Sequence, residues 1–200
     1  MSEIKVNKIS PATSTDITLG DSGDTFTVPS GATIVNSGTA TGFGGGKIGQ
    51  VLTVQNLDQE STSASSWVEI PDLSVTITPT ATDSKIWIVS CLTIGWAKTQ
   101  QMFQLMRDST AIGVGTAVDS MAAASFSVGY NEDSSPGPYY AFPSVFTWLD
   151  SPSTTSAIDY TMQWDCYTGF TSYLNSCNDQ SDSKYYCRTP SSITVMEVLA

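Results

Sequence analysis

Histidine is absent from this sequence of 200 residues. Its absence excludes the Ser-His-Asp and Cys-His arrangements that activate a nucleophile, and no Gly-x-Ser-x-Gly elbow is present. Paired carboxylates for glycoside hydrolysis remain a route to catalysis, with Asp150, Asp159 and Asp165 as candidates. Asp150, in Leu-Asp-Ser-Pro, is better interpreted as a turn former that accepts a backbone N–H two residues on. We expect no enzyme, with polysaccharide depolymerisation as the least favoured alternative.

Basic residues are scarce, because only eight Lys and Arg stand against nineteen Asp and Glu, a formal net charge of -11. Nucleic-acid binding rests on clustered cations, so we expect no nucleic acid and no anionic membrane surface as a partner. No apolar run approaches the ~18 to 20 residues that span a bilayer. The first residues also lack the apolar core of a signal peptide. We therefore expect synthesis in the cytoplasm and no membrane insertion.

The four cysteines follow no Cys-x-x-Cys pattern, and without histidine a zinc site is not expected. The glycine run that ends at Gly46 is not a phosphate loop. It continues as Lys47-Ile48, whereas a phosphate loop ends in Gly-Lys-Ser/Thr. We expect no cofactor and no metal. Cys91 is interpreted as a small buried hydrophobe. For Cys177 and Cys187 two states stay open, a disulfide in an oxidising exterior or free thiols.

The longest nearly continuous apolar run is the segment 85–96, Lys-Ile-Trp-Ile-Val-Ser-Cys-Leu-Thr-Ile-Gly-Trp. Its β-branched residues, a preceding Thr-Asp-Ser turn and an internal glycine favour a central strand over a short buried helix. Alternate residues point to opposite faces of a strand, and both faces of this one are mostly apolar. Such a strand needs cover on both sides, from a second sheet, a partner subunit, or both.

Short apolar runs recur through residues 47–200, separated by Pro and by Asp/Ser/Asn clusters. This pattern predicts an all-β fold, a jelly-roll β-sandwich, with the last strand in a central position. The expected strands are 51–55, 67–70, 73–78, 85–96, 101–107, 112–116, 123–130, 139–148, 157–164, 170–174 and 193–199.

Residues 1–46 differ in composition from the rest. Short apolar pairs alternate with Thr or lie between the turn clusters 19–24, 28–31 and 36–39. A single chain with so few large side chains cannot bury enough surface to offset its ordering entropy. This region is therefore either a flexible tail or a β-shaft intertwined among several chains. The alternation favours the shaft. The glycines that end at Gly46 mark the boundary of two domains, 1–46 and 47–200.

A group of aromatic residues falls in a polar stretch that lacks strand alternation. They are Tyr167, Phe170, Tyr173, Tyr185 and Tyr186. Rings with a polar handle in exposed loops suit stacking on sugars or pressing into a partner protein, which makes these residues the candidate receptor contact. The alternative is that they pack the wide end of the sandwich or a subunit axis.

Several segments carry a resemblance to a known class of proteins. Residues 2–11, 18–33 and 38–46 resemble the N-terminal parts of short fibre-like virion proteins of tailed phages, especially phages of marine cyanobacteria. Residues 84–88, 105–113, 149–152 and 193–198 are similar to the heads of these proteins, which have a C1q/TNF-like jelly roll. The resemblance implies a homotrimer in the virion with a role in display or host adsorption.

On this resemblance, residues 1–43 are expected to anchor the protein to other virion proteins, of the tail or of the capsid. Ile4, Val6 and Ile9 are expected to make the apolar contacts of this anchor. Lys5 and Lys8 are expected to meet acidic groups on the partner. The expected function is a fibre or spike whose trimeric head contacts a host surface glycan. A capsid decoration or head-fibre protein with a structural role is the alternative.

Overall fold

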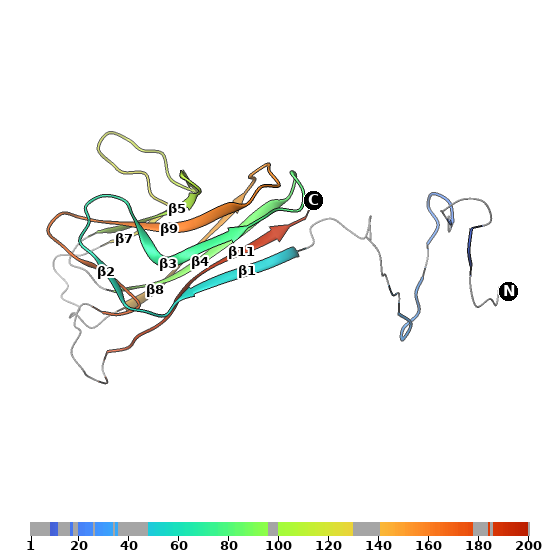
Figure 1. The fold of residues 1–200 in the computed structure, drawn as a ribbon, viewed down its shortest axis with the longest axis horizontal. Coiled ribbons are helices and arrows are strands. Elements are labelled where there is room, and N and C mark those ends of the chain that lie inside the picture. The colour runs from blue at the N-terminus through green and yellow to red at the C-terminus, as the bar shows by residue number, and fades with distance from the viewer. Residues whose placement is uncertain are drawn as a thin grey trace. The chain divides into compact units, whose positions relative to one another are not determined.

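The computed structural model describes residues 9–11, 17, 20–25, 27–33, 35, 48–95, 100–129, 141–177, 184 and 186–199. The chain divides into two units, Met1–Phe43 and Gly44–Ala200. Every strand among the described residues belongs to the second unit (Figure 1). Within the described part of the chain, no helix is long and apolar enough to cross a membrane.

Eleven strands form among the described residues of the second unit. They are β1 (Ile48–Asn56), β2 (Glu60–Thr62), β3 (Val68–Ile77), β4 (Lys85–Gly95), β5 (Gln101–Arg107), β6 (Thr110–Ile112), β7 (Phe126–Val128), β8 (Ala141–Asp150), β9 (Ile158–Cys166), β10 (Ser172–Leu174) and β11 (Ser191–Val198). Most lie where apolar alternation predicted a strand, and β5 has the predicted bounds. The strand β2 was not anticipated, because Glu-Ser-Thr has no apolar residue to give the period-two signal.

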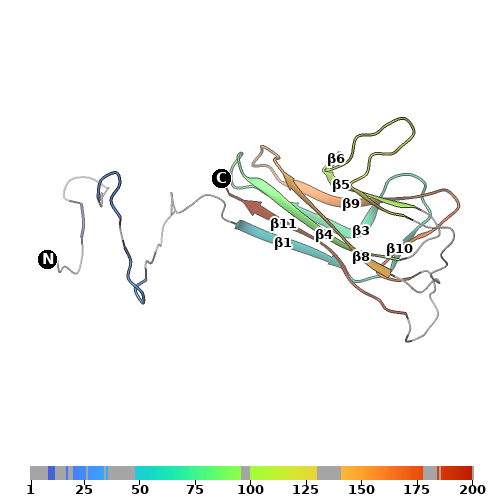
Figure 2. The same cartoon turned by 180° about the vertical axis from the view of Figure 1, so that it is seen from behind.

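Eight of these strands pair as one long hairpin folded back on itself. The antiparallel pairs are β1 with β11, β3 with β9, β4 with β8 and β5 with β7. Further pairing of β11 with β4 and of β9 with β5 joins them into two sheets. Sheet A contains β1, β11, β4 and β8 with β10 and β2, and sheet B contains β3, β9, β5, β6 and β7 (Figure 2). This is the order of a jelly roll, so the expected all-β sandwich is confirmed.

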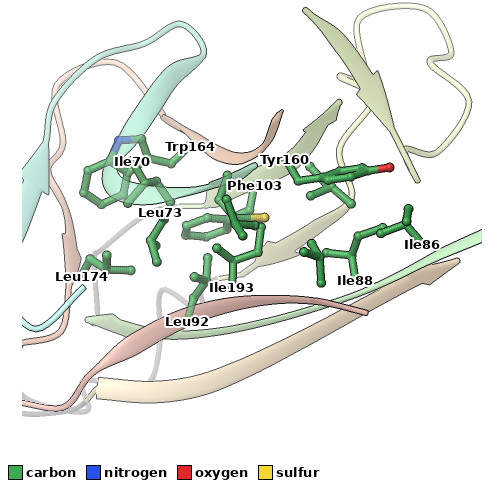
Figure 3. Packing of buried hydrophobic residues seen from close by; sticks show 14 of the residues in the cluster. Ile70, Leu73, Ile86, Ile88, Leu92, Phe103, Tyr160, Trp164, Leu174 and Ile193 are labelled. Atoms are coloured by element: carbon green, nitrogen blue, oxygen red, sulfur yellow. The ribbon is translucent and has the colours of Figure 1, made fainter. Parts of the chain in front are cut away.

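The hydrophobic core lies between the two sheets and is built by alternate residues of each strand. In β9, for example, Tyr160, Met162 and Trp164 are buried, and Ile86, Ile88 and Leu92 of β4 face them from the other sheet (Figure 3). Burying a side chain of this size contributes roughly 1.5 to 3 kcal/mol. The core is complete within one chain, so the second unit has what it needs to fold alone.

The central strand of sheet A is covered on one side only. Ile86, Ile88, Leu92 and Ile94 are buried in the core, whereas Trp87, on the opposite face of β4, is 44% exposed. The second sheet therefore covers the inner face of β4, as its apolar pattern required. The outer face of β4 remains exposed to solvent in the single chain.

The segment 67–78 contains one strand, β3, instead of the two that were expected. Pro71 and Asp72 interrupt the apolar pattern, but they form an irregularity within β3 where the pairing with β9 shifts between Glu69 and Ser74. Asp72 takes a positive φ of 54° there. Asn56 donates a hydrogen bond to the carbonyl of Pro71 (2.8 Å). A bulge accommodates a proline that lacks an N–H for the ladder, so the strand continues through it.

A buried carboxylate secures the end of β11. Glu197 is fully buried and accepts hydrogen bonds from the Thr80 amide (2.6 Å), the Thr80 hydroxyl (2.7 Å) and the Gln50 side chain (2.8 Å). Burial alone would raise the pKa of Glu197, but the hydrogen bonds from Thr80 and Gln50 outweigh it and hold the pKa below its ordinary value. The ionised side chain thus joins β1, the β3–β4 connection and β11.

The first unit contains turns where the sequence predicted them. The Asp24 amide donates to the carbonyl of Asp21 (3.0 Å), and the Ala32 amide donates to that of Pro29 (3.1 Å). Every residue of 9–35 that the structure describes is exposed, and none of them is in a strand. The single chain therefore gives no cover to the described apolar residues of this segment, Ile9, Ile17, Val28 and Val35. The intertwined β-shaft stays a prediction.

Candidate functional site

Two exposed aromatic rings lie together on the turn between β9 and β10. The Phe170 amide donates a hydrogen bond to the carbonyl of Tyr167 (3.2 Å), which closes a four-residue turn. Gly169, the third residue, has φ +86°, a conformation that type II turns assign to glycine. The ring centroids of Tyr167 and Phe170 are 6.3 Å apart and tilted by 44°. Tyr167 is 66% exposed and Phe170 37% exposed, so the pair offers an aromatic surface to solvent.

The strands on either side hold this aromatic turn, residues 167–170, in place. Cys166 ends β9 with its side chain buried, and its amide donates to the carbonyl of Ala64 (3.0 Å). After the turn, β10 begins at Ser172, which pairs with Thr62 of β2. The turn therefore connects sheet B to sheet A through anchored residues. The rings are displayed on a fixed support, which suits a binding surface because little ordering entropy is lost on contact.

Of the other three predicted receptor residues, the structure describes Tyr173 and Tyr186, and both are half-buried. Tyr173 lies in β10, where strand alternation was not expected, and is half-buried over β4. Its Cβ is 2.8 Å from where a Cβ on Gly95 would stand. Tyr185 lies outside the described residues. Among the described members of this group, Tyr167 and Phe170 are the exposed ones, whereas Tyr173 is half-buried beside Gly95 of β4. The receptor contact of five aromatic residues stays a prediction.

A buried polar network lies under the connections that follow β10. Asn175 is fully buried with φ 61°, and its side-chain amide donates to the Asn56 carbonyl (2.9 Å) and to the Asp58 carbonyl (2.7 Å). Its oxygen accepts a hydrogen bond from the Ser191 hydroxyl (2.6 Å), which itself accepts from the Thr93 amide (3.0 Å). The network joins β1, β4, β10 and β11. Sequence reasoning missed it, because an isolated Asn-Ser in a polar stretch is typical of an exposed turn.

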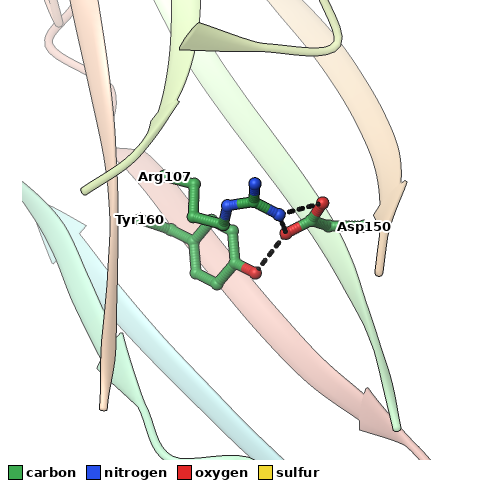
Figure 4. Close-up of polar contacts among 3 residues, drawn as sticks. All are labelled: Arg107, Asp150 and Tyr160. Atoms are coloured by element: carbon green, nitrogen blue, oxygen red, sulfur yellow. Dashed lines mark hydrogen bonds and ion pairs between the residues drawn. The ribbon is translucent and has the colours of Figure 1, made fainter. Parts of the chain in front are cut away.

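A second polar cluster joins the two sheets. Arg107 of β5 donates from Nη1 to both carboxylate oxygens of Asp150 (3.0 Å each), and the Tyr160 hydroxyl donates to the same carboxylate (2.7 Å) (Figure 4). Burial first, and then the hydrogen bond to Asp150, raises the pKa of Tyr160 far above its ordinary value. The turn-forming role expected for Asp150 was wrong, since this buried residue ends β8 and binds across the sandwich.

The three carboxylates considered for glycoside hydrolysis do not form a catalytic pair. Asp150 points between the sheets, whereas Asp159 and Asp165 lie on the outer face of sheet B. Burial raises the pKa of Asp165 above its ordinary value. However, Asp165 lies six positions along β9 from Asp159, roughly 20 Å at the rise of a strand. Hydrolytic pairs stand about 5 to 9.5 Å apart, so these residues do not supply one.

The remaining candidate residues are placed only in part. Ile9 is 62% exposed, whereas Ile4, Lys5, Val6 and Lys8 of the expected anchor lie outside the described residues.

None of the four cysteines forms a disulfide. Cys177 is buried and Cys187 is exposed, so these two do not form the disulfide that the sequence left open. Cys91 was expected to be a small buried hydrophobe, but it is only half-buried, on the outer face of β4. No group of three or more His, Cys, Asp or Glu side chains among the described residues is placed to hold a metal ion.

Comparison with known proteins adds little to this picture. No protein-family model matches the chain, and no curated protein matches its sequence. One similar solved structure is titled "Structure of infectious bursal disease virus Gx strain", with a TM-score of 0.35 and 13% sequence identity over 84% of this chain. The match covers 43% of the chain in that structure, so the present chain spans less than half of its length. A likeness at this level does not bear on function.

Proposed function

We propose that this chain is a structural protein of a virion, a short fibre or spike that displays the β-sandwich as its head. One observation carries the proposal. The sandwich has a complete core of its own, whereas every described residue of 9–35 is exposed, including Ile9 (62%) and Val35 (82%). A self-sufficient head beside a segment that needs cover from other chains is the organisation expected of a displayed protein. The resemblance of residues 2–11, 18–33 and 38–46 to fibre-like virion proteins of tailed phages supports the same role.

In this proposal residues 1–43 attach the protein to the particle, and the assembled form is a homotrimer. Lys5 and Lys8 would meet acidic groups on the docking protein, while Ile4, Val6 and Ile9 would supply apolar contacts. The head would contact the host surface through the aromatic turn. Tyr167 and Phe170 are suited to this because aromatic faces stack on sugar rings and Tyr adds a hydroxyl for hydrogen bonding.

Removing residues 1–43 tests the attachment. Because the core lies wholly within the second unit, the truncated protein should fold and unfold with nearly the same midpoint as the full chain. It should be missing from virions assembled in its presence, as measured by immunoblotting purified particles against full-length protein as the control. A truncated protein that still enters the particle would place the anchor elsewhere. A second variant that lacks the head, residues 47–200, tests the decoration role. If this variant is incorporated fully and its particles adsorb normally, the decoration role is favoured instead.

Replacing both Tyr167 and Phe170 with alanine tests the contact with the host. Tyr167 is 66% exposed and Phe170 37% exposed, so the free energy of unfolding should fall by about 1 kcal/mol, well short of the ~3 to 5 kcal/mol that truncating a fully buried ring costs. Losing a stacking pair costs on the order of 1 to 3 kcal/mol in binding, which predicts adsorption to host cells slower by about tenfold or more. Adsorption constants of particles carrying the variant measure this directly.

Two glycine variants serve as matched controls for that experiment. Gly169→Ala keeps both rings but strains the turn that sets their spacing, because alanine disfavours φ +86°. Gly129→Ala introduces the same methyl group into open space at ordinary φ. Adsorption should fall with the first and not with the second. Normal adsorption by the double alanine variant would remove the aromatic turn as the receptor contact.

A further inference from the structure

The outer face of sheet A carries a continuous row of apolar side chains. Val51 of β1 is directly opposite Met196 of β11, Met196 is opposite Trp87 of β4, and Trp87 is opposite Leu149 of β8. Directly opposed side chains on neighbouring strands share a face, so these four form a line across the whole sheet. Val51 is 56% exposed, Trp87 44% and Leu149 51%. The strands that bear them lie side by side in Figure 1.

The positions beside this row are uncharged with one exception. Cys91 of β4 and Val145 of β8 are paired, and Val145 is 63% exposed. The remaining outward positions of the four strands are Val, Ile, Thr, Ser, Gln, Ala, Pro and Gly, apart from Lys85 at the start of β4. No carboxylate points outward from these strands, although the chain contains nineteen Asp and Glu. The outer face of sheet A is called the apolar face below.

Sheet B shows what a solvent-exposed face of this protein looks like. Its outward positions include Glu69 of β3 and Asp159 and Asp165 of β9, with Gln163 between the last two. The two sheets thus share one core, but only the outer face of sheet B carries carboxylates at these positions. A sheet with one solvated side usually carries charged and polar residues on that side, and the carboxylates of sheet B fit this rule, whereas the outward positions of β1, β11, β4 and β8 carry none. Exposed apolar patches of several strands mark interaction sites.

We infer that the apolar face is covered by other copies of the same chain. The net charge of the chain indicates which partner covers the apolar face. Copies that each carry a net charge of -11 repel one another, and they associate most readily through a surface that bears no carboxylates. A basic partner would instead be met by acidic side chains, which this face lacks. The inference deepens the proposed function by naming the surface through which its homo-oligomer forms, and it rests on that oligomer.

The size of the face agrees with the central part of a subunit interface. Four strands about 4.8 Å apart and some six residues long cover on the order of 400 Å². Stable interfaces bury about 800 Å² per partner, with an apolar centre inside a polar rim. The apolar face therefore supplies the centre, and Lys85 and the flanking Thr and Gln residues belong to the rim.

The full-length protein should be an oligomer by light scattering, and salt should strengthen the association. Screening between about 0.02 M and 0.5 M salt weakens repulsion among like-charged copies without weakening apolar contacts. Val145→Glu should weaken the association by at least about tenfold, because it brings carboxylates of like sign together. Val118→Glu is the matched control, since Val118 is also exposed (49%) but lies in the β6–β7 connection, away from the apolar face.

Cys91 provides a second measurement that does not depend on the folding of a variant at position 145. With Cys187→Ser, Cys91 is the one thiol that is not buried, because Cys166 and Cys177 are. Its reaction with a thiol reagent should slow as protein concentration rises and copies cover the face. A rate independent of concentration would overturn the inference, as would a folded monomer. An oligomer that persists with Val145→Glu and with Leu149→Glu would also overturn the inference. The proposed homotrimer would then form through residues 1–46, so the proposed function would stand.

Discussion

Replacing Asp150 with alanine should lower the free energy of unfolding by about 3 kcal/mol, near the low end of the ~3 to 5 kcal/mol that removing one partner of a buried ion pair costs. The low end applies because the Arg107 side chain is 30% exposed and water compensates part of its charge. The Tyr160 hydroxyl is buried and loses its acceptor, which adds to the loss. Urea denaturation followed by tryptophan fluorescence measures the change.

Two further variants separate the causes of that loss. Asp150→Asn keeps the shape and an acceptor oxygen for Tyr160 but removes the charge that faces Arg107, so it should lose less stability than alanine. Asp83→Ala removes an exposed carboxylate from the β3–β4 connection and should change the free energy of unfolding by no more than about 0.5 kcal/mol. An alanine at position 150 that proves as harmless as the one at position 83 would show that the cluster does not join the sheets.

Gly95→Ala should be as destabilising, by about 3 kcal/mol, for a steric reason. A Cβ at this position would stand 2.3 Å from the carbonyl oxygen of Ser176 and 2.8 Å from the Cβ of Tyr173. The nearest atom belongs to the backbone, so relief requires the β10–β11 connection to move away from the end of β4. That connection is held by Asn175, whose amide donates to the Thr93 carbonyl (2.8 Å). Movement there disturbs the buried polar network as well.

Thermal unfolding of the Gly95 variant against Gly115→Ala measures the steric effect. At Gly115 the nearest atom to an added Cβ is the Ala124 carbonyl oxygen at 4.0 Å, an ordinary contact. That substitution adds the same methyl group and should cost less than about 1 kcal/mol. Equal midpoints for the two variants would mean that the β10–β11 connection does not press on β4 in solution.

The sequence by itself determined where most of the strands lie. Side chains of a strand alternate between its faces, and this period of two is readable over a few residues. It placed Gln101–Arg107 correctly and identified the run from Lys85 as a central strand. Turns 21–24 and 29–32 were also predicted, because Gly, Pro, Asp and Ser specify turns locally. Local chemistry failed at Pro71, where a bulge lets β3 continue.

Only the tertiary structure decided which distant residues meet, because pairing between strands depends on contacts that no local pattern encodes. Asp150 looked like a turn residue until the jelly roll brought Arg107 and Tyr160 to it. The aromatic group was likewise divided by the fold, which exposed Tyr167 and Phe170 and packed Tyr173 against β4. The apolar character of β4 on both sides was visible in the sequence. That its outer side continues through β1, β11 and β8 as one uncharged face follows from the register of four strands drawn from widely separated parts of the chain.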